Sequence, residues 1–284
     1  MQHYQWYPGH MTKAMRQMHK DMRLIDLLIE LVDARIPSSS RNPGIDDLGK
    51  HKARLIILNK ADLADEQYNR LWADEFRVQG YHVLEANAKS AQIGKAVLAK
   101  IRESCREKIE RDRKKGIIGR PIRAMVVGIP NVGKSTFVNA LAGRASTKTG
   151  DKPGVTKGKQ WISLKGNVEL LDTPGVLWPK FADQTVGLRL AMIGSINENI
   201  IDITELSHKI IEFMAQSYPG TLEAYYQMGT FADTSEALAM ICRERHCLLK
   251  GGEPDIVRAA RMLTLDFRAG KLGRVTLDRV IARR

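Results

Sequence analysis

The sequence of 284 residues predicts an α/β fold, in which a mainly parallel sheet carries helices on both faces and a small all-helical C-terminal domain follows. Short apolar, β-branched runs alternate with stretches long enough for helices, as in parallel strands joined by crossover helices. The last two runs, at 161–164 and 168–171, flank a Lys-Gly-Asn turn and predict a hairpin. Beyond Pro179 the strand pattern fades and helical spacing replaces it.

The elements follow from this pattern in order along the chain. Before the hairpin, strands are predicted at 24–32, 55–58, 82–84 and 124–127. A charged helix is predicted over 100–115, with one narrow buried stripe of Ile101, Cys105 and Ile109. After Pro179, helices are expected at 204–217 and 234–249, and Pro254 should open a last helix that ends at Gly270.

The charge of the chain is strongly positive and unevenly distributed. The 45 Lys and Arg residues exceed the 32 Asp and Glu residues, for a net charge of +13, which should attract polyanions such as nucleic acid or an anionic membrane. Residues 180–239 are acidic, whereas residues 240–284 are basic. The predicted Pro254 helix places Arg258, Arg261 and Arg268 on a face away from its apolar stripe. That face either docks on a phosphate backbone or simply stays solvated. The helix over 100–115, taken alone, is expected to be a solvated face, but together with the Pro254 helix it is a candidate surface for nucleic acid.

The cysteines and apolar runs exclude several classes of protein. Cys105, Cys242 and Cys247 are scattered and odd in number, which argues against a disulfide framework and structural zinc and favours a reducing compartment. The apolar runs are far too short for a membrane span, and the N-terminal residues lack the pattern of a secretory signal. We therefore expect a soluble, cytoplasmic, monomeric protein without a membrane-spanning segment. Its charge alone leaves a membrane surface open as a partner, and the motifs below favour nucleic acid over a membrane.

Residues 128–135, Gly-Ile-Pro-Asn-Val-Gly-Lys-Ser, match the phosphate-loop pattern and directly follow a predicted strand. Glycines let successive N–H groups and the next helix's N-terminus point at phosphates, while Lys134 reaches the β and γ oxygens and Ser135 ligates Mg²⁺. The alternative, a glycine-rich turn without a ligand, is disfavoured by the preceding strand.

Two further motifs also follow predicted strands. Asp172 opens Asp-Thr-Pro-Gly, in which the carboxylate can hold Mg²⁺ and the N–H of Gly175 can contact a γ-phosphate. Residues 59–62, Asn-Lys-Ala-Asp, end with a carboxylate that can accept hydrogen bonds from the N1–H and N2–H₂ edge of guanine, which adenine lacks. Pairing of this kind discriminates strongly between bases, so the motif favours GTP over ATP.

These motifs resemble those of the translation-factor-related GTPases, but the guanine motif comes before the phosphate loop. The order indicates a circular permutation, which a parallel sheet permits if a new link joins the old ends; residues 100–120 fit that link. Together with residues 8–11 (Pro-Gly-His-Met), 33–37 (Asp-Ala-Arg-Ile-Pro) and 153–158 (Pro-Gly-Val-Thr-Lys-Gly), the sequence closely resembles the bacterial YlqF/RbgA family of ribosome-assembly GTPases.

The resemblance implies a role for each motif. Asn59, Lys60 and Asp62 would read guanine, and Asn87-Ala88-Lys89 would form a second base-contacting loop, with Asn87 where Ser is usual. The residues expected to cradle the phosphates are Asn131, Val132, Gly133, Lys134, Ser135 and Thr136. Thr156 would reach Mg²⁺ only beside a γ-phosphate. Asn131 matches the position that ligates K⁺ in potassium-dependent relatives.

The residue that orients the attacking water is missing from its usual place. Ras-like enzymes use a Gln just after Asp-x-x-Gly, where this chain has Val176. The resemblance points to His10, in the Pro-Gly-His-Met motif, as the candidate, and a neutral imidazole can accept a proton from water near pH 7. Alternatively, His10 makes a ribosome or packing contact.

The resemblance also implies a domain organisation and a cellular function. We expect an N-terminal segment with the candidate catalytic His at 1–23, a permuted GTPase domain at 24–179 and a helical RNA-binding domain at 180–284. The protein would bind the precursor of the large (50S) ribosomal subunit with GTP, be stimulated there, and leave after hydrolysis late in assembly. The alternative is a nucleotide-gated RNA- or protein-binding regulator that does not act on the ribosome. An ATP-dependent metabolic enzyme is disfavoured by the guanine motif.

Overall fold

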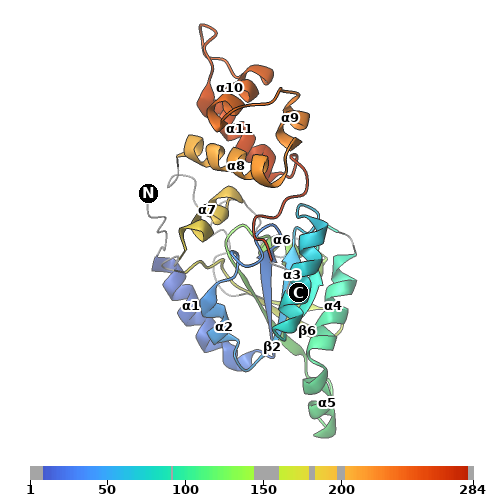
Figure 1. Cartoon of the computed structure of the whole chain (residues 1–284). Helices are drawn as coiled ribbons and strands as arrows, with labels where there is room; N and C mark the ends of the chain where they lie inside the picture. The colour runs from blue at the N-terminus through green and yellow to red at the C-terminus, as the bar shows by residue number, and fades with distance from the viewer. Residues whose placement is uncertain (1–8, 91, 144–159, 179–182, 197–201, 281–284) are drawn as a thin grey trace. The chain divides into compact units, whose positions relative to one another are not determined.

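The computed structural model describes residues 9–90, 92–143, 160–178, 183–196 and 202–280 (Figure 1). These residues form two compact units. We call residues 183–275 the helical unit, and the described residues of 9–178 together with 276–280 the sheet unit. The chain therefore leaves the sheet unit close to the expected boundary at residue 180 and returns to it after residue 275.

The sheet unit contains one six-stranded sheet in the order β3-β2-β1-β4-β6-β5. Only β5 runs antiparallel to its neighbour, β6, and the other pairs are parallel, as the sequence predicts. The strands are β1 (Leu27–Asp33), β2 (Ala53–Asn59), β3 (His82–Glu85), β4 (Ile122–Gly128), β5 (Gln160–Leu164) and β6 (Val168–Asp172).

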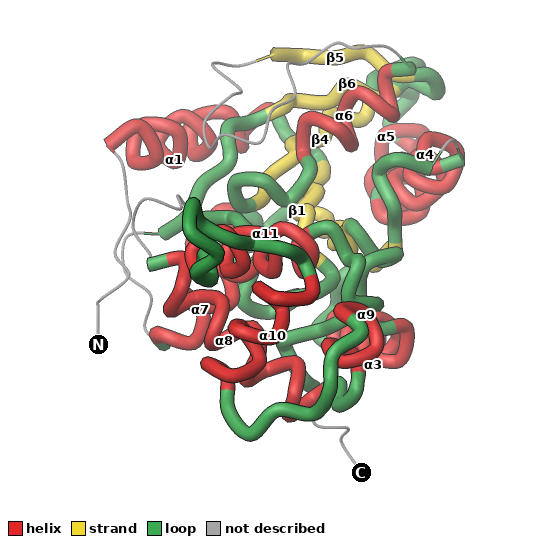
Figure 2. Tube along the Cα trace, turned by 90° about the horizontal axis from the view of Figure 1, so that it is seen from above, coloured by secondary structure: helices red, strands yellow, loops and turns green. Residues whose placement is uncertain are grey.

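Helices cover both faces of this sheet, which confirms the predicted fold class. Figure 2 shows α4 and α6 on one side and α1 on the other. The elements are α1 (Gly9–Asp21), the short 3₁₀ helix η1 (Met22–Leu24), α2 (Pro43–Leu48), α3 (Glu66–Val78), α4 (Ile93–Ser104), α5 (Arg106–Lys114) and α6 (Lys134–Ala142). In the described part of the chain, no helix has the length and hydropathy needed to cross a membrane.

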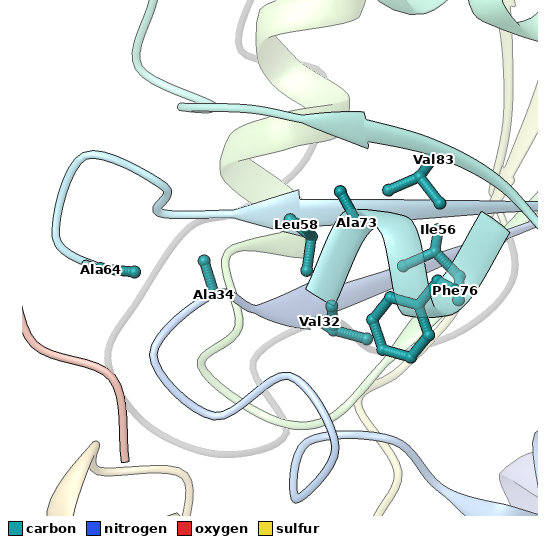
Figure 3. Close-up of a cluster of buried hydrophobic side chains, with 8 residues drawn as sticks. All are labelled: Val32, Ala34, Ile56, Leu58, Ala64, Ala73, Phe76 and Val83. Carbon is teal, nitrogen blue, oxygen red and sulfur yellow. The ribbon is translucent and has the colours of Figure 1, made fainter. Parts of the chain in front are cut away.

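The central strands are mostly apolar because both faces are covered; the exception within β1 is the buried Glu30, which forms ion pairs with Arg41 and Arg54. All seven residues of β1 are buried. On one face, Ala73 and Phe76 of α3 pack against Val32, Ile56 and Leu58 (Figure 3). This packing fixes the ends of β1 and β2, where polar side chains begin.

Two details near the permutation link differ from prediction. The helix expected over 100–115 is interrupted at Cys105, which separates α4 from α5. Ile101 and Cys105 are buried, but Ile109 is 40% exposed and α5 buries no residue. Figure 1 shows α5 extending past α4 and away from the sheet, so the apolar stripe ends where the helix leaves the sheet. The first strand begins at Leu27 instead of residue 24, because η1 precedes it.

The helical unit consists, in its described residues, of α7 (Gln184–Met192), α8 (Ile203–Ser217), α9 (Thr221–Tyr226), α10 (Thr234–Glu244) and α11 (Ile256–Arg268). Four of these helices begin after an Asp whose carboxylate accepts a hydrogen bond from a first-turn N–H: Asp183, Asp202, Asp233 and Asp255. Caps of this kind favour the start of a helix. Part of the acidity of residues 180–239 therefore serves helix capping.

The last helix differs from the prediction at its start and on its basic face. Pro254 precedes the helix and pairs with Leu248 in a β-bridge, while α10 ends at Glu244 instead of reaching residue 249. Arg268 is half-buried and donates to the carbonyl oxygens of Ala191 and Met192, at 2.8 and 3.0 Å. It stabilises the end of α7, so the exposed basic face consists of Arg258 and Arg261.

Candidate functional site

The three predicted motifs meet at one edge of the sheet. They follow the carboxyl ends of β4, β6 and β2, where open parallel sheets bind their ligands. The strand register pairs Val126 with Asp172 and Asp33 with Asn59. β1 thus lies between the phosphate-loop strand and the guanine-motif strand, and its terminal residue Asp33 joins the same edge.

The phosphate loop needs its glycines for close packing. Gly128 has φ +154°, and a Cβ there would lie 2.6 Å from the carbonyl oxygen of Leu31. Gly133, just before α6, has φ +100°, and its Cβ would lie 2.6 Å from Nδ2 of Asn59. Any larger residue would displace the guanine motif from the phosphate loop.

Lys134 folds back over this loop. Its Nζ donates to the carbonyl oxygens of Gly128 and Ile129, at 3.0 and 2.8 Å. Burial lowers the pKa of Lys134 to about 8, although Asp172 opposes the shift. A buried ammonium with few counter-charges is a strong attractor for phosphate oxygens.

Asp172 ends β6 with its side chain almost fully buried. Neither carboxylate oxygen has a hydrogen-bond partner among the described residues, and burial raises the pKa of Asp172 against the pull of Lys134. Buried acids normally have partners. This orphaned carboxylate therefore suits a cation or the water shell of one.

The segment after Asp172 packs against the phosphate loop. A Cβ on Gly175 would lie 2.9 Å from Nζ of Lys134 and from Cα of Pro130, and the N–H of Val176 donates to the carbonyl oxygen of Gly128 at 3.2 Å. The side chain of Val176 is 1% exposed. It packs into the protein and has no group that could orient water.

Asn59 joins the phosphate loop to both guanine loops. Its Nδ2 donates to the carbonyl oxygen of Val132 at 2.8 Å, and its Oδ1 accepts from the N–H of Ala88 at 3.1 Å. The side chain is 1% exposed. Asn59 therefore positions the phosphate loop and the loop of Ala88 relative to each other. A direct contact of Asn59 with the base stays a prediction.

The neighbouring guanine-loop residues differ in exposure. Asp62 is exposed and has no hydrogen-bond partner among the described residues, so its carboxylate is accessible to a base edge. Oδ1 of Asn87 accepts from the N–H of Lys89 at 2.8 Å. A Ser side chain makes the same kind of local turn more weakly, which explains why Asn can stand at this position.

Asp33 and Arg35 form a buried ion pair, to which the motifs assign no role. Arg35 donates to both oxygens of Asp33, from Nε at 2.9 Å and from the guanidinium end at 2.8 Å. Nζ of Lys60 donates to Asp33 and to the carbonyl oxygen of Asn131, both at 2.9 Å. Burial raises the pKa of Asp33, but Arg35 and Lys60 outweigh it and lower the pKa well below its usual range. The sequence signal was the Asp-Ala-Arg-Ile-Pro motif at 33–37, which supported the family resemblance but gave neither residue a role.

The remaining candidate residues are described by the structure to different extents. Ser135 and Thr136 lie half-buried in the first turn of α6, and Asn131 has the left-handed φ of +57°. His10 lies in the first turn of α1, but its side chain is outside the described part, and Thr156 is outside it altogether.

Comparisons with known proteins agree with this geometry. Residues 123–223 match the model of a family described as 50S ribosome-binding GTPase; this range includes the phosphate loop but not the guanine motif, as a permuted order requires. Ribosome biogenesis GTPase A of Bacillus cereus is 45% identical over 275 residues, which cover 96% of this chain and 93% of that protein. Mitochondrial ribosome-associated GTPase 1 of Bos taurus is 30% identical, over 96% and 88%.

A solved structure shares the fold over nearly the whole length. The crystal structure of GNP-bound YlqF from T. maritima superposes with a TM-score of 0.69 and 31% identity, over 94% of this chain and 98% of that one. The motifs, their meeting at one sheet edge and this full-length similarity lead to one assignment: the chain belongs to the ribosome biogenesis GTPase A (YlqF/RbgA) family of GTP-hydrolysing enzymes.

Proposed function

We propose that this GTPase acts late in assembly of the large (50S) ribosomal subunit, binding the precursor subunit in its GTP state and leaving after hydrolysis. The observation that carries the proposal is the full-length similarity to proteins named ribosome biogenesis GTPase A. A nucleotide site whose phosphate loop is tied to its guanine loops by Asn59 supports a nucleotide-gated switch.

In the proposed complex, guanine lies against Asp62 and the loop of Asn87 and Ala88, while residues 131–136 and Gly175 surround the phosphates. Ser135, Asp172 and Thr156 hold Mg²⁺, which neutralises charge on the β- and γ-phosphates. The buried, partnerless carboxylate of Asp172 supports this ligand set. Asn131 would hold K⁺ beside the phosphates.

Hydrolysis needs a group that orients water, and the buried Val176 cannot supply one. We assign this part to His10, with the large subunit stimulating turnover by fixing the N-terminal segment over the γ-phosphate. Because His10 acts on water instead of the nucleotide, it should contribute to turnover and not to nucleotide affinity.

Two exposed basic surfaces support contact with ribosomal RNA. Arg258 and Arg261 lie on α11 of the helical unit. On α5 of the sheet unit and the turn after it, Arg111, Arg113, Lys114 and Lys115 are exposed or half-buried. We propose that the protein binds the precursor as a monomer, with an affinity that falls steeply with salt.

Co-sedimentation with ribosomal subunits tests the proposal. The protein is mixed with purified large-subunit precursors, mature large subunits or small subunits, in the presence of a non-hydrolysable GTP analogue or of GDP. We expect co-migration with the large-subunit precursor that is stronger with the analogue than with GDP. Binding that is equal for both nucleotides, or absent from the large subunit, would favour a regulator acting elsewhere.

A further inference from the structure

The last described residues of the chain are built into the sheet unit. We call residues 276–279 the C-terminal strap. Thr276 is 0%, Leu277 4% and Asp278 2% exposed, so all three residues are almost fully removed from solvent. The strap begins directly after Val275, the last residue of the helical unit.

One side of the strap binds the loop that follows β1. The N–H of Leu277 donates to the carbonyl oxygen of Arg35 at 2.7 Å. The carboxylate of Asp278 accepts from Ser39 twice, from its N–H at 2.6 Å and from its hydroxyl at 2.7 Å. Hydrogen bonds to a buried carboxylate are among the stronger ones in proteins.

The other side of the strap binds the start of α3, just after the guanine motif. The N–H of Asp65 donates to the hydroxyl of Thr276 at 3.1 Å, and Nε1 of Trp72 donates to the carbonyl oxygen of Asp278 at 2.9 Å. The guanidinium of Arg279 lies 5.6 Å from the ring centre of Tyr68. The strap therefore bridges the segments before and after the guanine motif.

The contact with Arg35 continues inward to the nucleotide site. The Arg35 and Lys60 side chains both donate to the carboxylate of Asp33. Lys60 also donates to the carbonyl oxygen of Asn131 in the phosphate loop. Lys60 has a φ of +59°, a left-handed conformation that a non-glycine residue keeps only where its surroundings enforce it. Two backbone hydrogen bonds stabilise this turn, from the N–H of Leu63 to the carbonyl oxygen of Lys60 and from the N–H of Ala61 to that of Ala86. Asp33 fixes the Lys60 side chain, and the strap contacts the neighbouring Arg35.

We propose that the C-terminal strap is a positioning element for the guanine-binding loop, so that nucleotide affinity depends on the strap being docked. Because the strap is the covalent continuation of the helical unit, a partner that pulls on that unit can loosen the strap and change nucleotide affinity. By thermodynamic linkage, bound nucleotide must in turn strengthen docking of the strap. The inference rests on the proposed assignment of residues 59–62 to guanine, but not on the ribosomal partner.

The test compares Asp278→Asn with Asp47→Asn in the full-length chain. The first change removes one of the two acceptor oxygens that bind Ser39, whereas Asp47 is an exposed carboxylate on α2. Dissociation of a fluorescent GDP should be at least about fivefold faster in Asp278→Asn, the lower range of coupling between sites. The Asp47→Asn variant should release GDP at the wild-type rate.

A second readout separates positioning from loss of stability. IDP lacks the 2-amino group that a guanine-reading carboxylate accepts, so the ratio of GDP to IDP affinity measures how well the loop is placed. General destabilisation would lower both affinities together, whereas a displaced guanine loop should lower the ratio. In the wild type, hydrogen exchange at the Leu277 amide should slow when GDP binds.

If the strap stays docked in the Asp278→Asn variant, removal of the whole strap tests whether nucleotide affinity depends on it. A chain ending at Val275 is compared with one ending at Val280, which keeps the strap. Unchanged GDP release and an unchanged GDP-to-IDP ratio in the shorter chain would overturn the inference. Failure of the wild-type chain to prefer GDP over IDP would instead overturn the guanine-loop assignment itself.

Discussion

Asn59 and Asp33 are buried polar side chains with partners in other loops of the nucleotide site. Asn59 bonds to Val132 and Ala88, and Asp33 bonds to Lys60, so both connect loops far apart in the sequence. Buried polar groups that are satisfied in this way make a site rigid, whereas loss of one partner exposes the other to the full cost of burial.

The lowered pKa of Lys134 predicts that nucleotide binding takes up a proton at alkaline pH. With a pKa of about 8, the free protein loses the Lys134 charge as pH rises through 8, while bound phosphates should keep the lysine protonated. The number of protons taken up per bound nucleotide should therefore rise from about 0.1 at pH 7 to about 0.8 at pH 8.5.

Calorimetric titration with GDP, in buffers that differ in ionisation enthalpy, measures this number. The affinity for GDP should weaken over the same pH range, because the protonated form is the one that binds. Proton release at pH 8.5, or an uptake that does not change between the two pH values, would contradict the assigned role of Lys134.

Replacement of the candidate water-orienting residue, His10→Ala, should lower GTP turnover in the presence of large subunits by about 100-fold or more, a typical contribution of a general base. The affinity for a GTP analogue should stay nearly the same. His19→Ala, a change later in the same helix, is the matched control. Equal turnover in all three proteins would mean that another group orients the water.

At the scale of single residues, the motif positions could be predicted because their chemistry is encoded in local order. Lys134, Asp172 and Asp62 belong to recognisable patterns that begin at or directly after the ends of strands. The link from Asp33 to Lys60 and Arg35 could not be predicted, since it depends on which strands are neighbours. That pairing is set by the sheet register and not by any spacing in the chain.

The phosphate loop depends, at the scale of an element, on a close approach that only glycine allows. Gly133→Ala should weaken GDP binding at least about tenfold, because the Cβ would collide with Asn59. Gly143, at the other end of α6, also has a positive φ, but nothing lies within 4 Å of its Cβ position. Both Ala variants should lose about 1 kcal/mol of stability from backbone strain, which thermal unfolding measures.

Only Gly133→Ala should affect the nucleotide, and fluorescence titration with GDP makes the comparison. A similar loss of affinity in Gly143→Ala would show that strain in α6, rather than contact with Asn59, controls the loop. Full retention of affinity in Gly133→Ala would contradict the close packing of the two motifs.

The basic face of α11 should contribute to RNA binding through charge alone. Replacing Arg258 and Arg261 together by Gln should weaken binding to ribosomal RNA and reduce the slope of log affinity against log salt by about 2, near one per phosphate contact. The control pair, Arg70 and Arg77 on α3, already forms ion pairs with Glu66 and Asp74. Replacing this control pair by Gln should leave the slope unchanged, whereas equal effects of the two pairs would favour the solvated-face alternative.

Strands were the most predictable elements, because a sheet covered on both faces requires continuous apolar runs. Helix ends were less predictable. Ile109 continues the helical spacing of a buried stripe, yet it is exposed because α5 extends beyond the sheet. Arg268 resembles a member of the basic face in sequence, yet its partners are carbonyl groups at the end of α7.

At the scale of the whole molecule, the helical unit is an insertion with two attachments to the sheet unit. The first follows the Asp172 segment, and the second is the C-terminal strap beside the guanine loop. The sequence predicted a separate helical domain from its change of periodicity. The return of the chain at residues 276–279 was not predictable, because four residues with one buried acid carry no periodic pattern.

These attachments place both ends of the helical unit next to segments expected to respond to nucleotide. We expect a change at the γ-phosphate to act on the segment that contains Gly175 and Val176, and a change at the base to act on the strap through Asp65 and Arg35. This arrangement suits a protein whose partner binding and nucleotide state depend on each other.

Single-turnover GTP hydrolysis, measured as phosphate release with and without large-subunit precursors, tests the central claim most directly. We expect the precursors to accelerate hydrolysis of GTP by at least about tenfold, with small subunits and with ATP as controls that show no acceleration. Hydrolysis that is equally fast with and without the large-subunit precursor would contradict a GTPase switched by that particle.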